Sequence, residues 1–466
     1  MITIEMENKV FHHALKIRQD VCIGCSHCMR VCPTEALRVK DGKANLYENR
    51  CIDCGECFRV CPTNSIIIEQ DDFSKIFNYD YRVALMPSIL TGQFSDEITA
   101  TAVTSILKKL GFNEVIEVET SVEILKDEIN SYIANNRHTK PIISSFCPAI
   151  VRLIQVKFPS LVENLMLIKP PVDITSTYIK KKLQDKGIKE EQIGIFYITP
   201  CAAKIAAIKS PVGEEKSEVS GVLNMNLIYN KVLKSLVGLS EYEKEIKINK
   251  ECLTGKSLTW SLTNGEASQI HGRSLAIDGV NNVIEFLEKI ENEDISDIDF
   301  LELRACDESC AGGVLTSGNR FLTVERLKKR VSDSKNIKRK GLNNHILQYK
   351  DYLKDKMTIS EISPRSMLKL DEDMAKAMKK MERSNRIMCF LPGIDCGSCG
   401  APSCQALAED IVQGKAAISH CIFLQKTMEQ TRKLNPDHSF RIMEKIWGKD
   451  RFEKNCNKIE KSKRYH

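Results

Sequence analysis

Hydrophobic and polar residues follow two different periods along the middle of the chain. The runs YRVALMPSI (residues 81–89) and EVIEVET (114–120) are short and rich in apolar and β-branched residues, as strands are. Between them, TATAVTSILKKLGF (99–112) repeats its apolar residues with a helical period. Three later runs again predict strands that are followed by helix-like segments: 140–146, 192–200 and 297–305. This alternation predicts an α/β fold.

A cysteine follows each of the three later strands. These cysteines are Cys147, Cys201 and Cys306, and Cys310 lies four residues further on, at the spacing of neighbours on one helical turn. Ligands in α/β folds collect beyond the carboxyl ends of the strands, so we expect the four thiols to meet in one crevice. This predicts a buried cubane iron–sulfur site. The alternative is four unrelated core cysteines, because a free cysteine packs as a small hydrophobe.

Composition limits the class of protein. The chain has 466 residues, enough for roughly three domains, and its 42% hydrophobic and 28% charged residues predict folded cores. Residues 1–10 do not read as a signal peptide, and no apolar run is long enough to predict a membrane span. We therefore expect a cytoplasmic protein with no membrane partner. Its 19 cysteines would then be free thiols that bind metal.

The net charge of +6 comes from the C-terminal end of the chain. Residues 426–464 contain twelve Lys or Arg and six Asp or Glu, so the rest of the chain is balanced. A basic tail that includes Trp447 could contact nucleic acid or an acidic partner. The favoured interpretation is a solvated terminal helix, and nucleic acid is not expected as a partner.

The N-terminal region contains a duplicated cysteine motif. Each copy has the form Cys-x2-Cys-x2-Cys-x3-Cys-Pro, and the second copy follows the first by 29 positions. The two copies are Cys22, Cys25, Cys28, Cys32 and Pro33, and Cys51, Cys54, Cys57, Cys61 and Pro62. Two-residue gaps let three thiolates surround three corners of a cubane, which predicts two 4Fe–4S clusters that move electrons. Zinc in the CxxC pairs is the alternative.

This duplicated motif resembles that of the bacterial two-cluster ferredoxins. In that family the fourth thiolate of each run crosses to the other cluster. The resemblance implies that one cluster is bound by Cys22, Cys25, Cys28 and Cys61, and the other by Cys51, Cys54, Cys57 and Cys32.

A third cysteine constellation lies near the C-terminus. Its spacing is Cys396-x2-Cys399-x4-Cys404-x16-Cys421, with glycines that allow tight turns and a predicted helix at 405–417. It resembles the small four-cysteine 4Fe–4S domain of several anaerobic electron-transfer and corrinoid proteins, with zinc as the alternative metal. The remaining cysteines are interpreted as ordinary residues: Cys252, Cys389 and Cys456.

The segment between Arg330 and this constellation is highly charged and is predicted to be a linker with a surface helix. Met374, Met378 and Met381 recur there at i, i+4 and i+7. This spacing places them on one helix face, which we interpret as a packing face and not as a ligand set.

The middle region resembles the iron-only (FeFe) hydrogenase family. The resemblance rests on SSFCPAIVRLIQVKFPSL, ITPCAAK and LELRACDESCAGG, which occur in the order of that family's three signature loops. It implies a 4Fe–4S cubane held by Cys147, Cys201, Cys306 and Cys310. Cys310 would also bridge to a two-iron subcluster that carries CO and cyanide.

The same resemblance assigns three further residues to the pocket of the two irons. Lys204 matches the lysine that hydrogen-bonds a cyanide, and Pro87 and Ser88 match the pair that lines the pocket. These three residues are the predicted diiron-site residues.

Three positions depart from the family pattern. Phe146 stands where hydrogen-evolving members carry a proton-relaying cysteine, and Thr199 and Arg304 replace methionines that pack around the two irons. Loss of a proton-transfer group typically costs about 10²–10⁴ in rate. The metal ligands are therefore kept while the proton path is interrupted.

The order of these parts resembles the branch of the family that is regarded as sensory. We expect an α/β hydrogenase-like core with cluster ligands at strand ends, preceded by a small α+β two-cluster ferredoxin domain and followed by a small α-rich four-cysteine 4Fe–4S domain. The expected parts are a ferredoxin-type domain (1–72), the hydrogenase-like domain (80–330), a charged helical linker (331–385), the four-cysteine domain (386–424) and a basic tail (425–466).

The expected function is slow hydrogen binding, hydrogen sensing or low hydrogenase activity, with electrons passed through the accessory clusters. Hydrogen or protons would be the substrate, and an unidentified redox or signalling protein the partner. The alternative is a non-catalytic electron-transfer or cluster-handling protein that keeps the cubane without the two irons. Arg304, a bulky cation beside the diiron site, favours this alternative, so the question of enzyme or non-enzyme stays open at this point.

Overall fold

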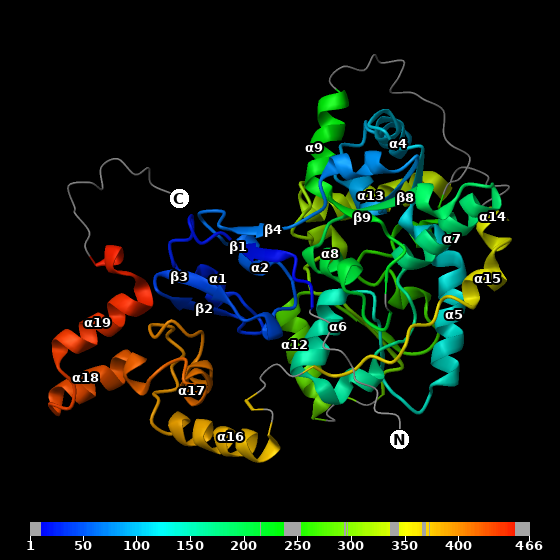
Figure 1. Ribbon diagram of the computed structural model, residues 1–466. Coiled ribbons are helices and arrows are strands. Elements are labelled where there is room, and N and C mark those ends of the chain that lie inside the picture. The colour runs from blue at the N-terminus through cyan, green and yellow to red at the C-terminus, as the bar shows by residue number, and fades with distance from the viewer. Residues whose placement is uncertain are drawn as a thin grey trace. The chain divides into compact units, whose positions relative to one another are not determined.

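The computed structural model describes residues 11–214, 216–236, 253–292, 295, 297–335, 344–365, 370–371 and 373–452 (Figure 1). The chain divides into two compact units, each described by itself below. Unit 1 comprises residues 1–14, 52–55 and 69–365, and unit 2 comprises residues 15–51, 56–68 and 366–466. Cys252 and Cys456 lie outside the described residues.

Unit 1 is built on two sheets in which every described strand pair is parallel. The larger sheet has the order β6-β5-β8-β9, and its strands are β5 Tyr81–Met86, β6 Glu114–Glu117, β8 Ile193–Thr199 and β9 Gly221–Asn224. The smaller sheet has the order β10-β11-β7, and its strands are β7 Ile142–Ile143, β10 Ser274–Ile277 and β11 Phe300–Leu303. All seven residues of β8 are buried, as expected for a strand covered on both faces. The predicted α/β fold is confirmed.

Helices connect and cover these strands. The described helices of unit 1 are α3 Ser88–Gly92, α4 Ala100–Lys109, α5 Val122–Asn135, α6 Pro148–Lys157, α7 Pro171–Asp185, α8 Ala202–Lys209, α9 Met225–Leu236, α11 Gly255–Leu258, α12 Val280–Glu291, α13 Arg320–Lys335, α14 Asn344–Leu347 and α15 Lys350–Lys354. Helix α4 illustrates why they form. The Thr99 hydroxyl caps it by accepting a hydrogen bond from the Ala102 amide, and its apolar stripe, which includes Val103 and Leu107, is buried in the core.

The loops that leave β7, β8 and β11 carry the predicted cysteine ligands. Cys147 immediately precedes α6, and Pro148 occupies the first position of that helix, where its missing N–H costs nothing. Cys201 immediately precedes α8. Cys310 lies in a short 3-10 helix, η7 Ser309–Gly312, beyond the end of β11. The sequence therefore delivers the cysteines to the carboxyl ends of parallel strands.

The N-terminal part of unit 2 consists of two antiparallel strand pairs and two short helices. β1 Leu15–Ile17 pairs with β4 Ile66–Ile68, and β2 Leu37–Lys40 pairs with β3 Lys43–Leu46. The helices α1 His27–Arg30 and α2 Glu56–Arg59 each contain the third cysteine of one motif copy. This is the small α+β module that the duplication predicted.

The C-terminal part of unit 2 is helical and packs on that module. Its helices are α16 Met374–Met388, α17 Cys404–Val412, α18 Ile422–Gln430 and α19 Pro436–Trp447. The Val39 amide of β2 donates to the Gly400 carbonyl at 2.8 Å, and the Arg38 guanidinium donates to the Asp410 carboxylate at 2.7 Å. Both partners of this ion pair are almost fully buried, so the two parts of unit 2 form one packed body.

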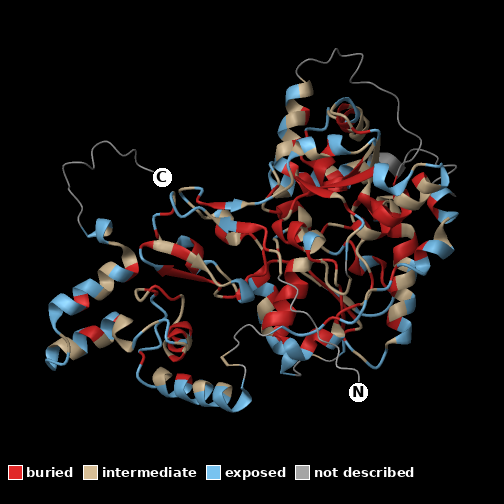
Figure 2. Cartoon of the chain, in the orientation of Figure 1, coloured by how far each residue is buried: buried red, intermediate tan, exposed pale blue. Residues whose placement is uncertain are grey.

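Two predictions about this region are wrong in part. The basic tail is not a solvated helix up to Phe452, because the Gly42 amide donates to the carbonyl of Ile446 in α19 and the Trp447 indole donates to the Ser398 carbonyl. The three methionines predicted to form a packing face do not form one either, because α16 packs on α17 through the side that carries Ile387 and Met388, and its outer side is exposed (Figure 2). Met374, Met378 and Met381 are 76%, 60% and 56% exposed.

Among the described residues, the structure contains no helix that is both long and apolar enough to span a membrane.

Candidate metal centre

Four thiols meet in unit 1. Burial raises the pKa of Cys201 to about 11, with Cys147 and Cys310 adding to this rise against the opposing charge of Lys204. Burial and the neighbouring Cys201, Cys147 and Cys310 raise the pKa of Cys306 well above its ordinary value. These four cysteines are half-buried, and thiols that repel one another in this way lose their protons only when a cation compensates their charge. Four converging thiolates are the donor set of a 4Fe–4S cubane.

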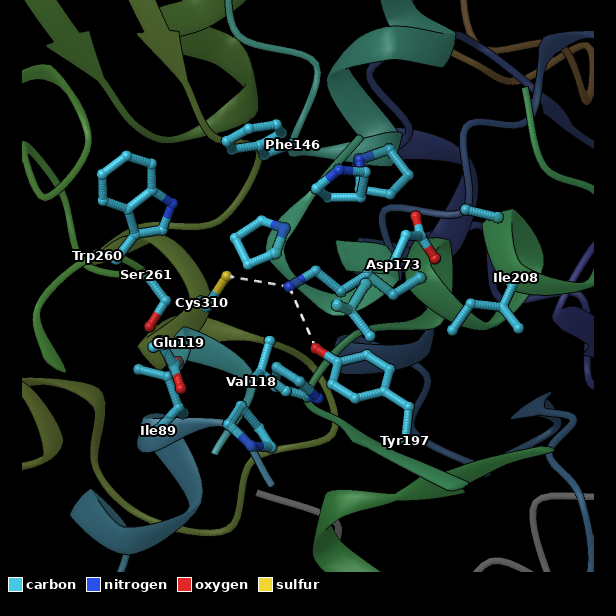
Figure 3. A pocket seen from close by; sticks show the side chains of 18 of the residues that line it. Ile89, Val118, Glu119, Phe146, Asp173, Tyr197, Ile208, Trp260, Ser261 and Cys310 are labelled. Atoms are coloured by element: carbon cyan, nitrogen blue, oxygen red, sulfur yellow. Dashed lines mark hydrogen bonds between the residues drawn. The ribbon is translucent and has the colours of Figure 1, made fainter. Parts of the chain in front are cut away.

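The ammonium of the half-buried Lys204 lies beside this thiol cluster. Lys204 Nζ is 3.6 Å from Cys310 Sγ and 3.4 Å from the Tyr197 hydroxyl (Figure 3). Burial lowers the pKa of Lys204, but Cys310 and Tyr197 more than offset this, so the pKa is raised and the ammonium stays protonated. Burial raises the pKa of Tyr197 to about 12. The site therefore contains a fixed positive charge that faces the sulfur of Cys310.

A pocket opens next to Lys204 and Cys310, and most of its wall is apolar (Figure 3). Its lining includes six prolines: Pro87, Pro148, Pro170, Pro171, Pro200 and Pro211. Phe146 is 5% exposed and also lines the pocket, with its ring centroid 6.4 Å from that of Trp260. The position that the resemblance assigns to a proton relay thus holds a phenyl ring, which lies beside an indole. Neither group can accept and release a proton at neutral pH.

Ser88 is turned to a carboxylate that the sequence analysis did not identify. Its amide is 3.0 Å from both carboxylate oxygens of Glu119, and its hydroxyl is 2.8 Å from Oε1 of the same group. Pro87 and Glu119 line the pocket, whereas Ser88 is fully buried and is not among the lining residues. Burial raises the pKa of Glu119 to about 7.

A second acid of the lining, Asp173, also has its pKa raised to about 7, mainly by burial and by Glu214.

Arg304 lines the pocket but is held by two buried acids. Its guanidinium forms an ion pair with Glu266 at 2.7 Å, and its Nε is 3.6 Å from Glu302. The Ser144 hydroxyl also donates to Glu266 at 2.8 Å. Burial raises the pKa of Glu266 to about 7, although the charge of Arg304 lowers it. The charge of Arg304 is therefore largely compensated on the protein side of the pocket.

Residues 52–55, which include Cys54 of the second cysteine motif, belong to unit 1. Cys54 lies close enough to Cys306 for its charge to raise the pKa of that thiol further. The neighbouring Asp53 is fully buried and accepts hydrogen bonds from Arg152 at 2.5 Å and from His13 at 2.8 Å. These contacts fix residues 52–55 against α6, the helix that begins after Cys147.

The thiols of unit 2 lie in a different environment. Burial raises the pKa of Cys28 to about 12, and Cys25, Cys22 and Cys61 add to it, so these four thiols are neighbours. Backbone amides point at two sulfurs of this unit: Ala36 N is 3.1 Å from Cys32 Sγ, and Ala44 N is 3.3 Å from Cys22 Sγ. Although burial raises the pKa of Cys61, hydrogen bonds from Ser65 and from backbone amides lower it to about 7. Hydrogen bonds to sulfur of this kind tune cluster potentials.

The four C-terminal cysteines line one small cavity. Burial raises the pKa of Cys399 to about 11, with Cys396 and Cys421 adding to this rise. The carboxylate of Asp395 accepts a hydrogen bond from the Cys404 amide at 2.6 Å and fixes the first turn of α17. Cys404 and Cys421 are buried, whereas Cys396 is exposed. The remaining described cysteine, Cys389, is also exposed and lies outside this cavity.

Segments of the chain match three protein-family models. Residues 82–250 match the family described as "Iron only hydrogenase large subunit, C-terminal domain". Residues 14–74 match the "4Fe-4S dicluster domain", and residues 391–423 match the family described as "Putative Fe-S cluster".

The chain is also similar to an individual protein of known name. The chain is 23% identical over 201 residues to the NADP-reducing hydrogenase subunit HndD of Solidesulfovibrio fructosivorans. This alignment covers 41% of this chain and 31% of that relative. The alignment thus spans about a third of the length of that relative.

Among solved structures, HydA(deltaEFG), from work on stepwise FeFe-hydrogenase H-cluster assembly, is 13% identical and has a TM-score of 0.48, covering 64% of this chain and 96% of that chain. A variant of FeFe-hydrogenase HydA1 from Chlamydomonas reinhardtii is 14% identical and has a TM-score of 0.47, covering 64% and 97%. The three family matches by themselves confirm the predicted resemblance: a hydrogenase-like segment lies between a 4Fe–4S dicluster domain and a further Fe–S domain.

Proposed function

Taking the chain as a hydrogenase-like iron–sulfur protein, we propose that it binds hydrogen slowly at a modified H-cluster and passes electrons through accessory 4Fe–4S clusters. The observation that carries this proposal is the pairing of Lys204 with Phe146 in one pocket. An ammonium 3.6 Å from Cys310 suits a cofactor with anionic ligands. A phenyl ring at the position that the resemblance assigns to the relay prevents fast proton supply.

The proposed ligands are the cysteines of the four constellations. The cubane of the hydrogenase-like domain would use Cys147, Cys201, Cys306 and Cys310. The ferredoxin-type clusters would use Cys22, Cys25, Cys28 and Cys61, and Cys51, Cys54, Cys57 and Cys32. The C-terminal cluster would use Cys396, Cys399, Cys404 and Cys421. Four clusters in parts bounded at 1–72, 80–330 and 386–424 are part of this proposal.

The residues around the pocket fit a two-iron subcluster with CO and cyanide. When bound, this group would supply the metal that activates hydrogen. Lys204 would hold one anionic ligand, because its ammonium already faces Cys310. The prolines and Phe146 would keep water away from the group, since most of the lining is apolar. Arg304 also lines the pocket, where Glu266 holds its guanidinium in an ion pair.

Proton exchange at this site would depend on the carboxyls of the pocket. Glu119 and Asp173 line it, and both have their pKa raised to about 7, so each can hold or release a proton near neutral pH. Neither carboxyl occupies the relay position, where Phe146 stands. Hydrogen turnover should therefore be slow while hydrogen binding persists. This is the behaviour of a sensor and supports the assignment to the sensory branch.

Electrons would leave the hydrogenase-like domain through Cys54, whose charge acts on Cys306. The further clusters would pass them to an unidentified redox or signalling protein. The free thiols favour a reducing, cytoplasmic location for this chemistry.

The second candidate is a non-catalytic electron-transfer or cluster-handling protein with the cubane alone. Arg304 favours it, because a cation in the lining occupies a position that the family fills with a methionine.

Infrared spectroscopy of the full chain, co-expressed with the maturation enzymes, distinguishes the two candidates. The proposal predicts stretching bands of metal-bound CO and cyanide together with slow hydrogen turnover. A loaded cubane without such bands would leave the electron-transfer candidate.

A further inference from the structure

Trp260 carries a hydrogen-bond donor that no described residue satisfies. The side chain is 2% exposed, and its Nε1 atom is buried without an acceptor among the described residues. An indole N–H is a donor only, and buried tryptophans usually have a partner for it. Buried unpaired donors are rare in folded proteins, so this one points to a group that the protein alone does not supply.

The orientation of Trp260 shows where that group would lie. Trp260 lines the pocket, and Figure 3 shows the nitrogen edge of its indole turned toward the pocket interior, on the side of Cys310. The Phe146 ring packs beside it with an interplanar angle of 39°. The backbone fixes the same relation, because the Cys310 amide donates to the carbonyl of Ser261, the next residue, at 3.2 Å. The indole is therefore set against the cysteine that would bridge to the two irons.

We infer that Trp260 is a positioning residue that donates its indole N–H to a metal-bound diatomic ligand, CO or cyanide, of the group attached at Cys310. This inference rests on the proposed function, because it requires the two-iron subcluster. Trp260 would then be a second fixed hydrogen-bond donor besides Lys204, so that the group would be held from two sides of the pocket. Unlike a thiol, an indole N–H donates a hydrogen bond without releasing its proton, which suits binding without fast turnover.

The test is the infrared spectrum of the maturase-expressed full chain with Trp260→Phe. This substitution keeps an aromatic ring beside Phe146 and removes only the donor. We expect at least one CO or cyanide band to shift, and the two-iron group to be lost roughly 2- to 10-fold more readily during gel filtration, as for one lost hydrogen bond. Trp447→Phe is the matched control, because its indole donates to the Ser398 carbonyl in unit 2, and it should leave these bands unchanged.

A second variant answers the same question if Trp260→Phe fails to fold. The chain has two tryptophans, so in the Trp447→Phe background, biosynthetic replacement of tryptophan by benzothienylalanine exchanges the Trp260 N–H for sulfur without changing the ring shape. It should shift the same band. Bands that coincide with those of the wild type in both variants would overturn the inference while leaving the proposed function intact. Absence of CO and cyanide bands in the wild type would instead refute the proposed function.

A separate observation concerns the surface around the C-terminal cluster. Helix α16 exposes Met374, Met378 and Met381, and the loop that follows it exposes Phe390 by 68% and Ile394 by 53%. Cys396, a proposed cluster ligand, is exposed two residues later. The apolar strip therefore leads along unit 2 to the one exposed cysteine of this constellation.

The charge of α16 indicates what covers this strip. Residues 374–388 contain five Lys or Arg and one Glu, and Lys376, Lys379 and Arg383 are exposed. A second copy of the chain would bring the same positive charge to the surface and be repelled. Helices that bind bilayers place Trp, Phe or Leu on their apolar face, whereas this face consists of methionines, which adapt to protein partners.

We propose that α16 and residues 390–396 dock an acidic one-electron carrier protein of the flavodoxin class. Electron-transfer complexes are small and are steered by complementary charge, which a basic rim around an exposed apolar strip provides. In the transfer, the reduced C-terminal cluster loses one electron, and the flavin takes it up with a proton to become the neutral semiquinone. This proposal rests on the proposed C-terminal cluster and not on the two-iron group.

Stopped-flow mixing of the reduced, cluster-loaded full chain with a purified acidic flavodoxin tests it. Met378→Asp combined with Lys379→Glu should slow semiquinone formation on the order of 10-fold, and added salt should slow the wild type toward the variant. The matched control is Leu322→Asp with Lys328→Glu on α13, where residues 320–332 also contain five Lys or Arg and one Glu, and Leu322 is 50% exposed. It should leave the rate unchanged.

Three results would overturn this docking proposal. The first is a wild-type rate of semiquinone formation in the α16 variant with an unchanged iron content. The second is a loss of this rate in the α13 control that equals the loss in the α16 variant. The third is binding of the wild type to itself in gel filtration, or to anionic vesicles, that the α16 variant abolishes while flavodoxin reduction is unaffected.

Discussion

The two units bring thiols together by different means. In unit 2, Cys396, Cys399 and Cys404 lie within nine residues, and backbone amides and hydroxyls donate to several cysteine sulfurs of the unit. In unit 1, Cys147, Cys201 and Cys306 come from separate strand ends, and the Lys204 ammonium lies 3.6 Å from the sulfur of Cys310. Local motifs thus gather thiols from one segment, whereas the tertiary fold of unit 1 gathers them from distant segments and places a mostly apolar pocket beside Cys310. We expect a further group to bind in that pocket.

Removing one cysteine ligand from each kind of site should have the largest effect. Cys404→Ser should remove one cluster, about four irons, and leave the pocket unchanged, because its ligands are gathered locally. Cys306→Ser should remove the cubane and the group attached at Cys310 together. Iron analysis and electron paramagnetic resonance measure both. Loss of several clusters in the Cys404→Ser protein would contradict the independence of the two sites.

Restoring a proton relay should have the next largest effect. Phe146→Cys places a thiol at the pocket wall, and hydrogen turnover should rise by up to about 10²–10⁴-fold. Phe146→Leu is the control, since it opens the wall without adding a titratable group. A similar gain in both variants would show that access and not proton transfer limits turnover.

Lys204→Met should weaken retention of the group in the pocket by roughly 10- to 100-fold, as for loss of a residue that orients a metal site. Infrared band intensity after gel filtration measures this retention. Lys209→Met, at the partly exposed end of the same helix, is the matched control. Equal retention in both variants would argue against an anionic ligand beside Lys204.

Glu119 should make the stability of unit 1 depend on pH. Burial raises its pKa from 4.5 to about 7, so the folded protein binds this proton more tightly than the unfolded chain does. Stability should therefore fall as pH rises from about 4.5 to 7, by up to about 3 kcal/mol. Glu119→Gln should flatten this part of the profile in denaturant titrations, and the exposed Glu97→Gln should not. An unchanged slope in Glu119→Gln would contradict a protonated acid in the pocket.

The sequence predicts residues whose spacing or position along a strand carries the signal. The cysteine motifs, the strand-end cysteines and Phe146 could be read from the chain, and Lys204 from its ITPCAAK context. Glu119 and Glu266 could not, because each is an ordinary polar residue until packing buries it against Ser88 or Arg304.

The two wrong predictions have the same origin. The α16 methionines have helical spacing, but spacing does not say which helix face finds a partner. The basic tail is polar, yet Trp447 and backbone hydrogen bonds anchor α19 to β2 and to the loop before α17. Both errors concern tertiary contacts between segments that are distant in sequence.

The most direct test of the central claim is the infrared spectrum of the maturase-expressed full chain recorded before and after exposure to hydrogen. A site that keeps its metal ligands but lacks the relay predicts CO and cyanide bands that change under hydrogen, while the same sample turns hydrogen over slowly. Bands that change together with turnover as fast as that of a dedicated hydrogenase would contradict the role assigned to Phe146, and a spectrum without such bands would contradict the pocket itself.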